Sequence, residues 1–349
     1  MVLETRSGWM QAVRANRFGQ ADVFELEDVP MPQPGPGQVL IRVESAAVNF
    51  ADVKRRRSDP YPFPTSLPYT PGGEVAGTVE ELGDGVDGLP VGTPVFALVG
   101  NDGSSGYAQF ALASAPQVIP IPPGLSPDVA SGLVIAGSAA LLILREAACL
   151  RAGESVLVQG AAGGVGGYAV QIAKLLGAGL VIGAAGTHEK RAAALALGAD
   201  LVVDYTQADW PDRVRELTNG RGVEVLLEMA GGATFERGIT CLAPFGRVVV
   251  YGSSSGESLQ MRADTINTLF YDPSPNQSLI AFNLGLWFGI RPDVAVDALT
   301  TLIGFVASGQ VDVPIGHVLP LSRAADAHRM LEERRSTGKI ILKPWATDR

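Results

Sequence analysis

The residues of this chain with the clearest chemical potential form a glycine-rich turn, GAAGGVG at 160–166, directly after the apolar run SVLVQ at 155–159. The turn reads A-x-G-x-x-G, with Ala161 in place of the first glycine of a dinucleotide-binding fingerprint. Gly163 allows the backbone to pass close to a pyrophosphate, and a helix beginning near Val165 directs its amino end toward that charge. Because the turn joins a predicted strand to a predicted helix, the sequence indicates a dinucleotide cradle rather than a purely structural turn.

The position that distinguishes NAD from NADP lies about 20 residues beyond such a turn, at the end of the next strand. An acidic residue there binds the 2′-hydroxyl of NAD, but this chain has Ala185, followed by GTHEKR at 186–191. Position 185 has no carboxylate to repel a 2′-phosphate, and Lys190 and Arg191 are close by, so the segment favours NADPH. Tyr205, just past the third strand, is placed to flank the adenosine. The alternative is that the two cations are only the solvated start of a helix.

Alternating apolar strands and amphipathic helices position this turn and run from Glu154 to about residue 282. Strands are predicted at 155–159, 179–185, 201–203, 223–229, 247–252 and 278–282, and helices at 165–176, 189–197, 211–218 and 233–242. This pattern predicts a doubly wound parallel sheet. Before it, short β-rich runs broken by proline and glycine indicate an irregular β-barrel-like domain. The run TGKIILKP at 337–344 has no partner among the six strands and is assigned to that first domain.

The length of 349 residues exceeds the size at which one core usually divides, so two domains are expected, 1–134 with 283–349 and 135–282. A net charge of -9 argues against a nucleic-acid or anionic-membrane partner. The longest apolar stretch, 130–144, is shorter than the roughly 18 residues of a membrane span. Two cysteines and the lack of a signal-peptide pattern at 1–9 fit a cytoplasmic protein.

Five segments of the chain, in order, resemble the zinc-independent quinone oxidoreductases of the medium-chain dehydrogenase/reductase superfamily. They are AAVNFAD (46–52), LPYTPGGEVAGTVEELGDGV (67–86), QGAAGGVGGYAVQIAKLLGA (159–178), LGADLVVDY (197–205) and HRMLEERRSTGKIILKP (328–344). The resemblance covers about residues 10–344. It implies an α/β fold in which a GroES-like irregular β-barrel catalytic domain is joined to a doubly wound Rossmann nucleotide-binding domain. It also implies a homodimer formed through the last strand of the nucleotide-binding domain.

Zinc-using members of this superfamily hold their metal with a cysteine and a histidine in two of these segments, where this chain has Asn49 and Gly73. Neither residue binds zinc well. Glu74 remains beside Gly73 and is expected to orient backbone. The three histidines are distant in sequence, and two of them are expected on surface helices; they are His188, His317 and His328. We therefore expect no catalytic zinc.

The resemblance also implies roles for individual side chains. Asn49 and Asp52 line the nicotinamide and substrate cleft, and Tyr61 matches a loop from which enoyl reductases of this superfamily donate a proton. Ser138 stands where the family often has a threonine near the nicotinamide, and the surrounding GSAA departs from the family pattern, which predicts a roomier pocket. The other implied cofactor contacts are Ala161, Gly163, Gly164, Val165, Gly186, Thr187, Lys190, Tyr205, Gly252, Ser253, Phe282, Leu284 and Lys339.

Several of these residues also have a structural interpretation. Asp52 can cap the helix that follows it, or do this as well as line the cleft. For Tyr61, in a proline-rich loop, an ordinary surface aromatic is the favoured interpretation. The basic run KRRR at 54–57 is expected to be a solvated helix face, with steering of an anionic thioester substrate as the alternative. Tyr107, in SSGYAQF, is expected to pack in the core.

Without a metal to polarise an alkoxide, the chemistry that remains is hydride transfer from a nicotinamide to an acceptor that is already electrophilic. The sequence therefore predicts a zinc-free, NADPH-dependent reductase of quinones. Two alternatives stay open. One is a reductase of enones or enoyl thioesters in a biosynthetic pathway, and the other is a protein that binds NADPH without catalysing a reaction.

Overall fold

The computed structural model describes residues 8–257, 261–271 and 275–347, and the chain packs as two compact units. The first unit combines the residues up to Ile135 with those from Ile315 onward, and the second unit is the continuous stretch Ala136–Pro314. Residues 283–314, which the sequence analysis places in the first domain, therefore pack with the second.

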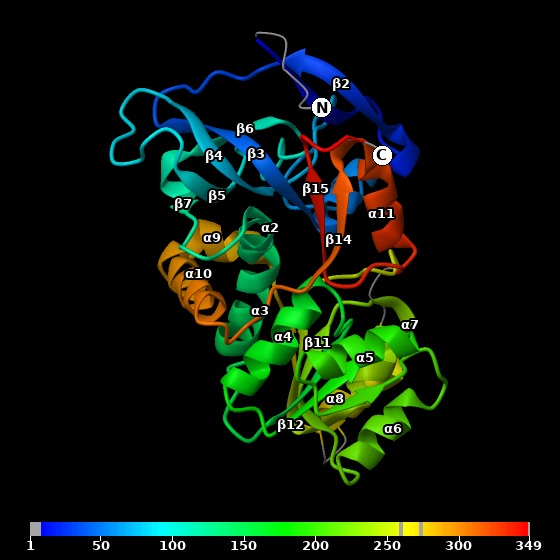
Figure 1. Ribbon diagram of the computed structural model, residues 1–349. Coiled ribbons are helices and arrows are strands. Elements are labelled where there is room, and N and C mark those ends of the chain that lie inside the picture. Colours follow the sequence, from blue (N-terminus) through cyan, green and yellow to red (C-terminus); the bar gives the residue numbers. More distant parts are fainter. Residues whose placement is uncertain (1–7, 258–260, 272–274, 348–349) are drawn as a thin grey trace. The chain divides into compact units, whose positions relative to one another are not determined.

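The first unit is built on a seven-stranded sheet. Its strands are β3 (Gln38–Val48), β4 (Glu74–Leu82), β5 (Pro94–Leu98), β6 (Phe110–Ser114), β7 (Val118–Pro120), β14 (Ile315–Pro320) and β15 (Lys339–Lys343). The order is β14-β15-β3-β4-β5-β7, with β6 also paired to β3 (Figure 1). β15 pairs antiparallel with β3, Ile341 facing Ala47. The C-terminal strand is therefore part of the sheet of the first unit.

Shorter elements complete the first unit. β1 (Trp9–Ala15) and β2 (Phe24–Pro30) form a separate antiparallel ribbon. The helices are α1 (Phe50–Arg57), α2 (Pro127–Ser131) and α11 (Ala324–Glu332). α1 follows the apolar strand β3, and α2 follows the proline-rich loop after β7. A core of small and β-branched residues from β3, β4, β5 and β15 is fully buried, which explains why these strands read as nearly continuous apolar runs.

The second unit contains a six-stranded sheet whose neighbouring strands are all parallel. Its strands are β8 (Ser155–Gln159), β9 (Leu180–Ala184), β10 (Leu201–Val203), β11 (Val223–Glu228), β12 (Leu242–Val250) and β13 (Ser278–Ala281). The helices between them are α4 (Gly164–Leu175), α5 (His188–Ala196), α6 (Trp210–Leu217), α7 (Gly232–Ile239) and α8 (Ala263–Tyr271). The order β10-β9-β8-β11-β12-β13 confirms the doubly wound prediction. From β8 the chain adds β9 and β10 on one side and then β11, β12 and β13 on the other, so the strand order reverses between β8 and β11.

A helical layer adjoins this sheet and explains the position of residues 283–314. It comprises α3 (Ser138–Leu142), which lies between π-helical turns at Leu133–Gly137 and Ile143–Ala147, together with α9 (Leu284–Ile290) and α10 (Pro292–Ala307). α10 packs against both α3 and α9. Leu302 of α10 lies so close to Gly137 that any side chain at Gly137 would collide with it. The predicted domain boundary differs from the observed one because the apolar side of α10 packs against α3 of the second unit.

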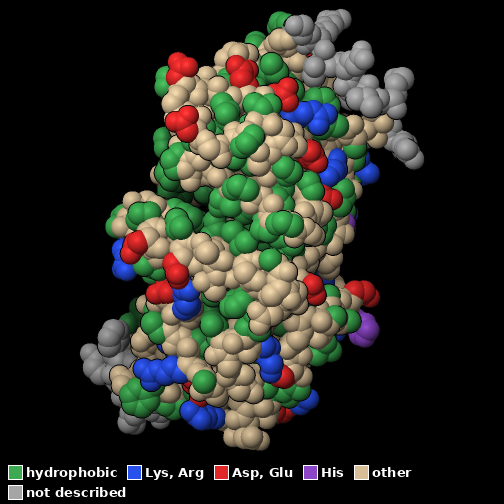
Figure 2. Space-filling view, turned by 60° about the vertical axis from the view of Figure 1, so that its left-hand side comes forward, with side chains coloured by type: hydrophobic (Ala, Val, Ile, Leu, Met, Phe, Trp, Pro, Cys, Tyr) green, Lys and Arg blue, Asp and Glu red, His purple; other side chains and the backbone are tan. Residues whose placement is uncertain are grey.

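Within the described ranges, no helix is long and apolar enough to cross a membrane. On the face drawn in Figure 2, lysine and arginine side chains lie scattered among aspartate and glutamate.

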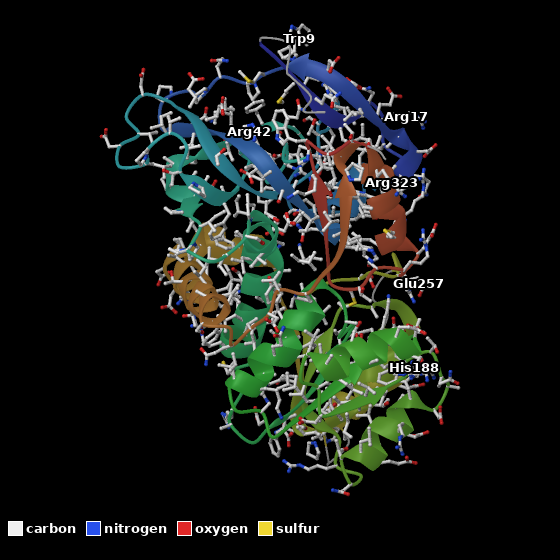
Figure 3. All side chains as sticks on the ribbon, in the orientation of Figure 1. Trp9, Arg17, Arg42, His188, Glu257 and Arg323 are labelled. Atoms are coloured by element: carbon white, nitrogen blue, oxygen red, sulfur yellow. The ribbon has the colours of Figure 1, made fainter. Side chains whose placement is uncertain are left out.

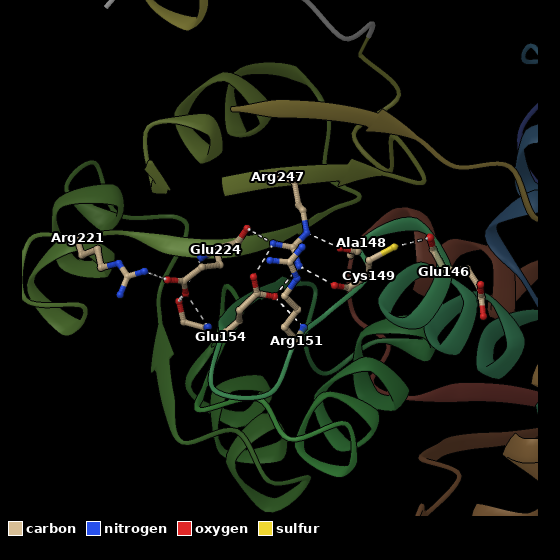
Figure 4. A network of polar contacts seen from close by, with 9 residues as sticks. Glu146, Ala148, Cys149, Arg151, Glu154, Arg221, Glu224 and Arg247 are labelled. Carbon is tan, nitrogen blue, oxygen red and sulfur yellow. Dashed lines mark hydrogen bonds and ion pairs between the residues drawn. The ribbon is translucent and has the colours of Figure 1, made fainter. Parts of the chain in front are cut away.

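Arg247 of β12 organises the amino-terminal edge of the parallel sheet (Figure 4). Its guanidinium binds both carboxylate oxygens of Glu154 at 3.0 and 2.6 Å and donates to the carbonyl oxygens of Ala148 and Cys149. Glu224 of β11 lies beside it and accepts from the hydroxyl of Ser155 at 2.5 Å. These contacts tie the end of a helical turn to three strands, at the edge opposite the glycine-rich turn.

We predict that Arg247→Met lowers the free energy of unfolding of the second unit by about 2 kcal/mol, because Glu154 and two carbonyl groups lose their hydrogen bonds to the guanidinium. Thermal unfolding followed by circular dichroism checks this. Arg213→Met removes an exposed ion pair on α6 and serves as the control, with an expected change within about 0.5 kcal/mol. Equal midpoints for the two variants would contradict the assignment.

Candidate functional site

The glycine-rich turn of the second unit has the geometry of an anion cradle. Gly160 follows β8 with φ of 62°, a conformation that favours glycine, and its carbonyl accepts from the amide of Gly163 at 2.8 Å. A Cβ at Gly166 would lie 2.9 Å from the Cα of Ala161 and closer still to the oxygen of Gly160. Helix α4 therefore meets the turn at a distance that only glycine allows, and its first amides, which have no intrahelical acceptor, are available to an anion.

The end of β9 lies at the position that distinguishes the two cofactors. Ala185 is buried there, and Thr187 caps α5 by accepting from the amide of Lys190 at 3.3 Å. The ring of Tyr205 lies next to Gly186, so the structure brings these two predicted residues together. His188 begins α5 on the outside of the unit (Figure 3).

Arg191 differs from its expected role. It donates to the carbonyl oxygen of Ala185 at 3.2 Å and forms an ion pair with Asp204 at 2.8 Å. Partial burial acts to raise the pKa of Asp204, but hydrogen bonds from Thr206 and the Arg191 guanidinium outweigh it and hold this pKa below its usual value. Asp204 therefore compensates the charge of Arg191.

Ser138 and the loops after β12 and β13 also bear on whether a dinucleotide fits the second unit. The hydroxyl of Ser138 is fully buried at the start of α3 and has no hydrogen-bond partner within the described residues. Gly252 and Ser253 follow β12, and Ser253 donates to the carbonyl of Glu257 at 2.7 Å. Phe282 follows β13 and stacks on Trp287 of α9, which begins at Leu284. An orphaned buried hydroxyl together with the cradle at Gly160 and Gly166 fits a dinucleotide.

Two buried polar side chains at the reversal point of the sheet were not identified from the sequence. Glu228 ends β11 and accepts from the amides of Ala230 and Gly231, each at 2.8 Å, whereas its second oxygen has no partner within the described residues. Gln159 ends the neighbouring strand β8 and is equally buried. Burial raises the pKa of Glu228 to about 7. A polar residue at the end of each of two adjacent apolar strands was the available signal.

In the first unit, three side chains form a buried triad, which we call the Asn49 triad: Asn49 at the N-cap of α1, Glu74 of β4 and Lys339 of β15. Lys339 Nζ donates to Asn49 Oδ1 at 2.7 Å and to Glu74 Oε1 at 2.9 Å. Asn49 Nδ2 donates to the same Glu74 oxygen at 3.0 Å. The other Glu74 oxygen accepts from the amide of Ile135 at 2.8 Å, so Glu74 orients backbone as expected. The predicted residues Asn49 and Lys339 are thus in direct contact.

Asp52 occupies the capping position that the sequence suggested. Its carboxylate accepts from the amide of Asn49 at 2.9 Å, from the amide of Gly72 at 3.0 Å and from the hydroxyl of Tyr107 at 3.2 Å. Burial raises the pKa of Asp52 to about 6, against the opposing effect of these donors. Tyr107 is buried as expected, and its hydroxyl also contacts His328 Nε2 at 3.2 Å.

The basic run at 54–57 is not a solvated face, which corrects that prediction. Arg55 is 1% exposed and binds Asp102 and the carbonyls of residues 102 and 103. Arg56 is fully buried and donates to Glu332 and to His328 Nδ1. His328 is therefore a core residue of α11, and the expectation of a surface position for it was wrong.

Tyr61 lies in the loop after α1 and is half-buried. The guanidinium of Arg55 lies 5.5 Å from the centre of its ring and 4.8 Å from that of Tyr69. Burial raises the pKa of Tyr61, and the charge of Asp52 acts in the same direction while Arg55 opposes it. Arg55 therefore fixes the loop that carries Tyr61 through packing and hydrogen bonds.

The positions that hold zinc in related enzymes are occupied by other groups. Asn49 bonds to Lys339 and Glu74, and a Cβ at Gly73 would lie 3.1 Å from the carbonyl oxygen of Gly103. Across residues 8–257, 261–271 and 275–347 there is no group of three metal-binding side chains.

Comparisons with known proteins extend over both units. The family model "Alcohol dehydrogenase GroES-like domain" matches residues 35–123, and "Zinc-binding dehydrogenase" matches residues 164–271. A 2-haloacrylate reductase of a Burkholderia species is 33% identical to this chain over 97% of this chain and 100% of that protein. The quinone oxidoreductase of Sus scrofa is 34% identical, covering 95% of this chain and 97% of that protein. The structure of Escherichia coli quinone oxidoreductase complexed with NADPH has a TM-score of 0.86 and 28% identity, covering 96% of this chain and all of that one.

Proposed function

Because this chain belongs to the medium-chain dehydrogenase/reductase superfamily as a relative of the quinone oxidoreductases, we propose that it reduces quinones with NADPH and without a metal. The expected fold, a GroES-like domain with a Rossmann-type parallel sheet, is the fold of this family. The observation that carries the proposal is the combination of a dinucleotide cradle at Gly160 and Gly166 with Asn49 and Gly73 in place of zinc ligands.

The proposed reaction is a two-electron reduction. When bound, the reduced nicotinamide supplies a hydride, and the quinone takes up this hydride and one proton to become a hydroquinone. The cradle at Gly160–Gly166 holds the pyrophosphate, and Ser138 offers a buried hydroxyl to the cofactor. Asn49 keeps an amide donor for an acceptor oxygen, and Asp52 holds the start of α1 in place. The protein contributes orientation and hydrogen bonds.

A second candidate is reduction of an activated carbon–carbon double bond. The similarity to a 2-haloacrylate reductase and the half-buried Tyr61 beside Arg55 favour this alternative. Tyr61 would then donate the proton that the α-carbon needs after hydride addition to the β-carbon. A third candidate, NADPH binding without turnover, is favoured only if no acceptor is reduced.

An NADPH-oxidation screen across quinones, enones and enoyl thioesters tests the proposal. We expect turnover with quinones, and Tyr61→Phe is expected to leave it within about threefold of the parent because quinone oxygens are protonated readily from solvent. Tyr61→Phe slowing an enoyl thioester by about tenfold or more would favour the second candidate. Tight NADPH binding without oxidation by any acceptor would contradict both enzymatic functions.

We predict that NADPH binds at least about tenfold more tightly than NADH, because Ala185 rather than an acid directly follows β9 and Lys190 lies within the first turn of α5. Lys190→Ala is expected to narrow this ratio by about fivefold, as measured by cofactor fluorescence titration. Lys174→Ala, which removes a partly exposed ion pair with Asp200 on α4, is the control and should leave the ratio unchanged. Equal affinities of the parent protein for NADPH and NADH would contradict the cofactor assignment.

We also propose a cytoplasmic homodimer formed through β13. β13 ends the six-stranded sheet, and apolar side chains are exposed on it and on the adjacent helix α9, namely Leu279, Leu286 and Ile290. The free thiols of Cys149 and Cys241 fit a reducing compartment. Sedimentation velocity of the protein and of Leu279→Lys tests the dimer, and a monomeric parent would contradict it.

A further inference from the structure

We propose that Lys339, together with Glu74, is a positioning residue that fixes the side-chain amide of Asn49 and polarises it toward the hydride acceptor. This inference rests on the proposed function and deepens it. It replaces the direct cofactor contact expected for Lys339 with an effect exerted through Asn49.

The donor and acceptor inventory of the Asn49 triad allows only one orientation of the amide. A lysine ammonium has donors and no acceptor, so the atom of Asn49 that lies 2.7 Å from Lys339 Nζ is the carbonyl oxygen. The carboxylate of Glu74 has acceptors only, so the atom 3.0 Å from it is the amide nitrogen. Exchanging the two amide atoms would place donor against donor and acceptor against acceptor.

Burial shows which member of the triad a ligand can touch. Glu74 is 0% exposed and Lys339 is 2% exposed, whereas Asn49 retains 8% of its surface. The amide nitrogen of Asn49 has two hydrogens, of which one is directed to Glu74. The second hydrogen has no protein acceptor among the residues that the structure describes. Lys339 and Glu74 are thus sealed behind Asn49.

The positive charge of Lys339 acts on the amide of Asn49 through one hydrogen bond. The ammonium of Lys339 withdraws electron density from the Asn49 carbonyl, which strengthens the amide as a donor in a site with little water. Glu74 balances the ammonium, so no uncompensated charge is buried. A zinc-dependent relative would use its metal for polarisation at this position, whereas here a neutral amide, backed by a cation, donates to the acceptor oxygen.

A double-mutant cycle tests this inference. Glu74→Gln with Lys339→Met removes both buried charges together, and Asn49→Ala removes the donor. We expect the paired substitution to lower kcat for quinone reduction at least tenfold, with the dissociation constant of NADPH within threefold of the parent. In a protein that already carries Asn49→Ala, the paired substitution is expected to lower kcat by less than twofold relative to Asn49→Ala alone. Lys343→Met, on the same strand but bound to Asp128, is the matched control.

Two results would overturn the inference: losses that multiply in the combined variant, or a tenfold weaker binding of NADPH in the paired variant with kcat retained. Asn49→Asp removes the donor and leaves an acceptor for Lys339, so it tests the same point if the paired variant does not fold. It should lose at least tenfold in kcat, and wild-type kcat in this variant would contradict the role of the amide.

A spectroscopic measurement separates this inference from the proposed function. The side-chain amide protons of Asn49, assigned by their loss in Asn49→Ala, are expected to exchange slowly with water in the parent and at least tenfold faster in the paired variant. Unchanged exchange would overturn the positioning role. A parent protein that reduces no acceptor would contradict the proposed function instead, and the exchange measurement would still decide the orientation of Asn49.

Discussion

Replacing Gly166 with alanine is expected to weaken NADPH binding by about 10- to 100-fold, equivalent to about 1.4–2.8 kcal/mol. The added methyl group would overlap the carbonyl of Gly160 and lie 2.9 Å from the Cα of Ala161. Because both contacts are to backbone, helix α4 must shift away from the turn, and its first amides then no longer point at the pyrophosphate. Fluorescence titration with NADPH measures the effect.

Gly304→Ala provides the control for this experiment. Gly304 lies within α10 of the same unit, and a methyl group there meets no atom within 4 Å. It should leave NADPH binding unchanged and stabilise the helix slightly, since alanine has the higher helix propensity. Similar dissociation constants for Gly166→Ala and the parent would show that the cradle does not bind the cofactor.

Neutralising Glu228 is expected to stabilise the second unit at alkaline pH by as much as about 3 kcal/mol. Burial raises the pKa of this carboxyl from 4.5 to about 7 in the folded protein. The folded state therefore holds its proton more tightly than the unfolded state, and stability falls as the pH rises from about 4.5 to about 7. A shift of this size corresponds to about 3 kcal/mol once the carboxyl is fully ionised.

Glu228→Gln keeps an oxygen that accepts from the amides of Ala230 and Gly231 and removes the ionisation. Urea unfolding at pH 8 should show a higher free energy for this variant than for the parent, and at pH 4.5 the two should be nearly equal. Glu216→Gln, on the exposed face of α6, should follow the parent at both values. Identical pH profiles for Glu228→Gln and the parent would contradict the buried-carboxyl assignment.

The sheet of the second unit was predictable because each strand is a short, continuous apolar run bounded by turn residues. The runs at 155–159 and 201–203 coincide with β8 and β10, since both faces of these strands are covered and their residues are therefore continuously apolar. The glycine-rich turn was predictable for a related reason. Gly160 and Gly166 are required by backbone geometry, and such requirements are visible in the residues themselves.

The pairing of buried charges was not predictable, because a single sequence shows a charge but not its partner. Arg55 and Arg56 stand in a run of four cations, and their partners Asp102 and Glu332 lie 47 and 276 residues away. Lys339 contacts Asn49 across 290 residues. The ribbon of β1 and β2 was also missed, because its residues alternate only weakly between buried and exposed positions.

The pairing of β15 with β3 sets an order of assembly while the chain is being synthesised. The second unit is continuous in sequence, so it can fold as soon as residue 314 has left the ribosome. The first unit cannot complete its sheet until residues 339–343 have also emerged, although β3 was made long before. Contacts over so great a separation form slowly. Lys339 therefore reaches Asn49 last, and nascent chains can form the glycine-rich turn before they form the triad.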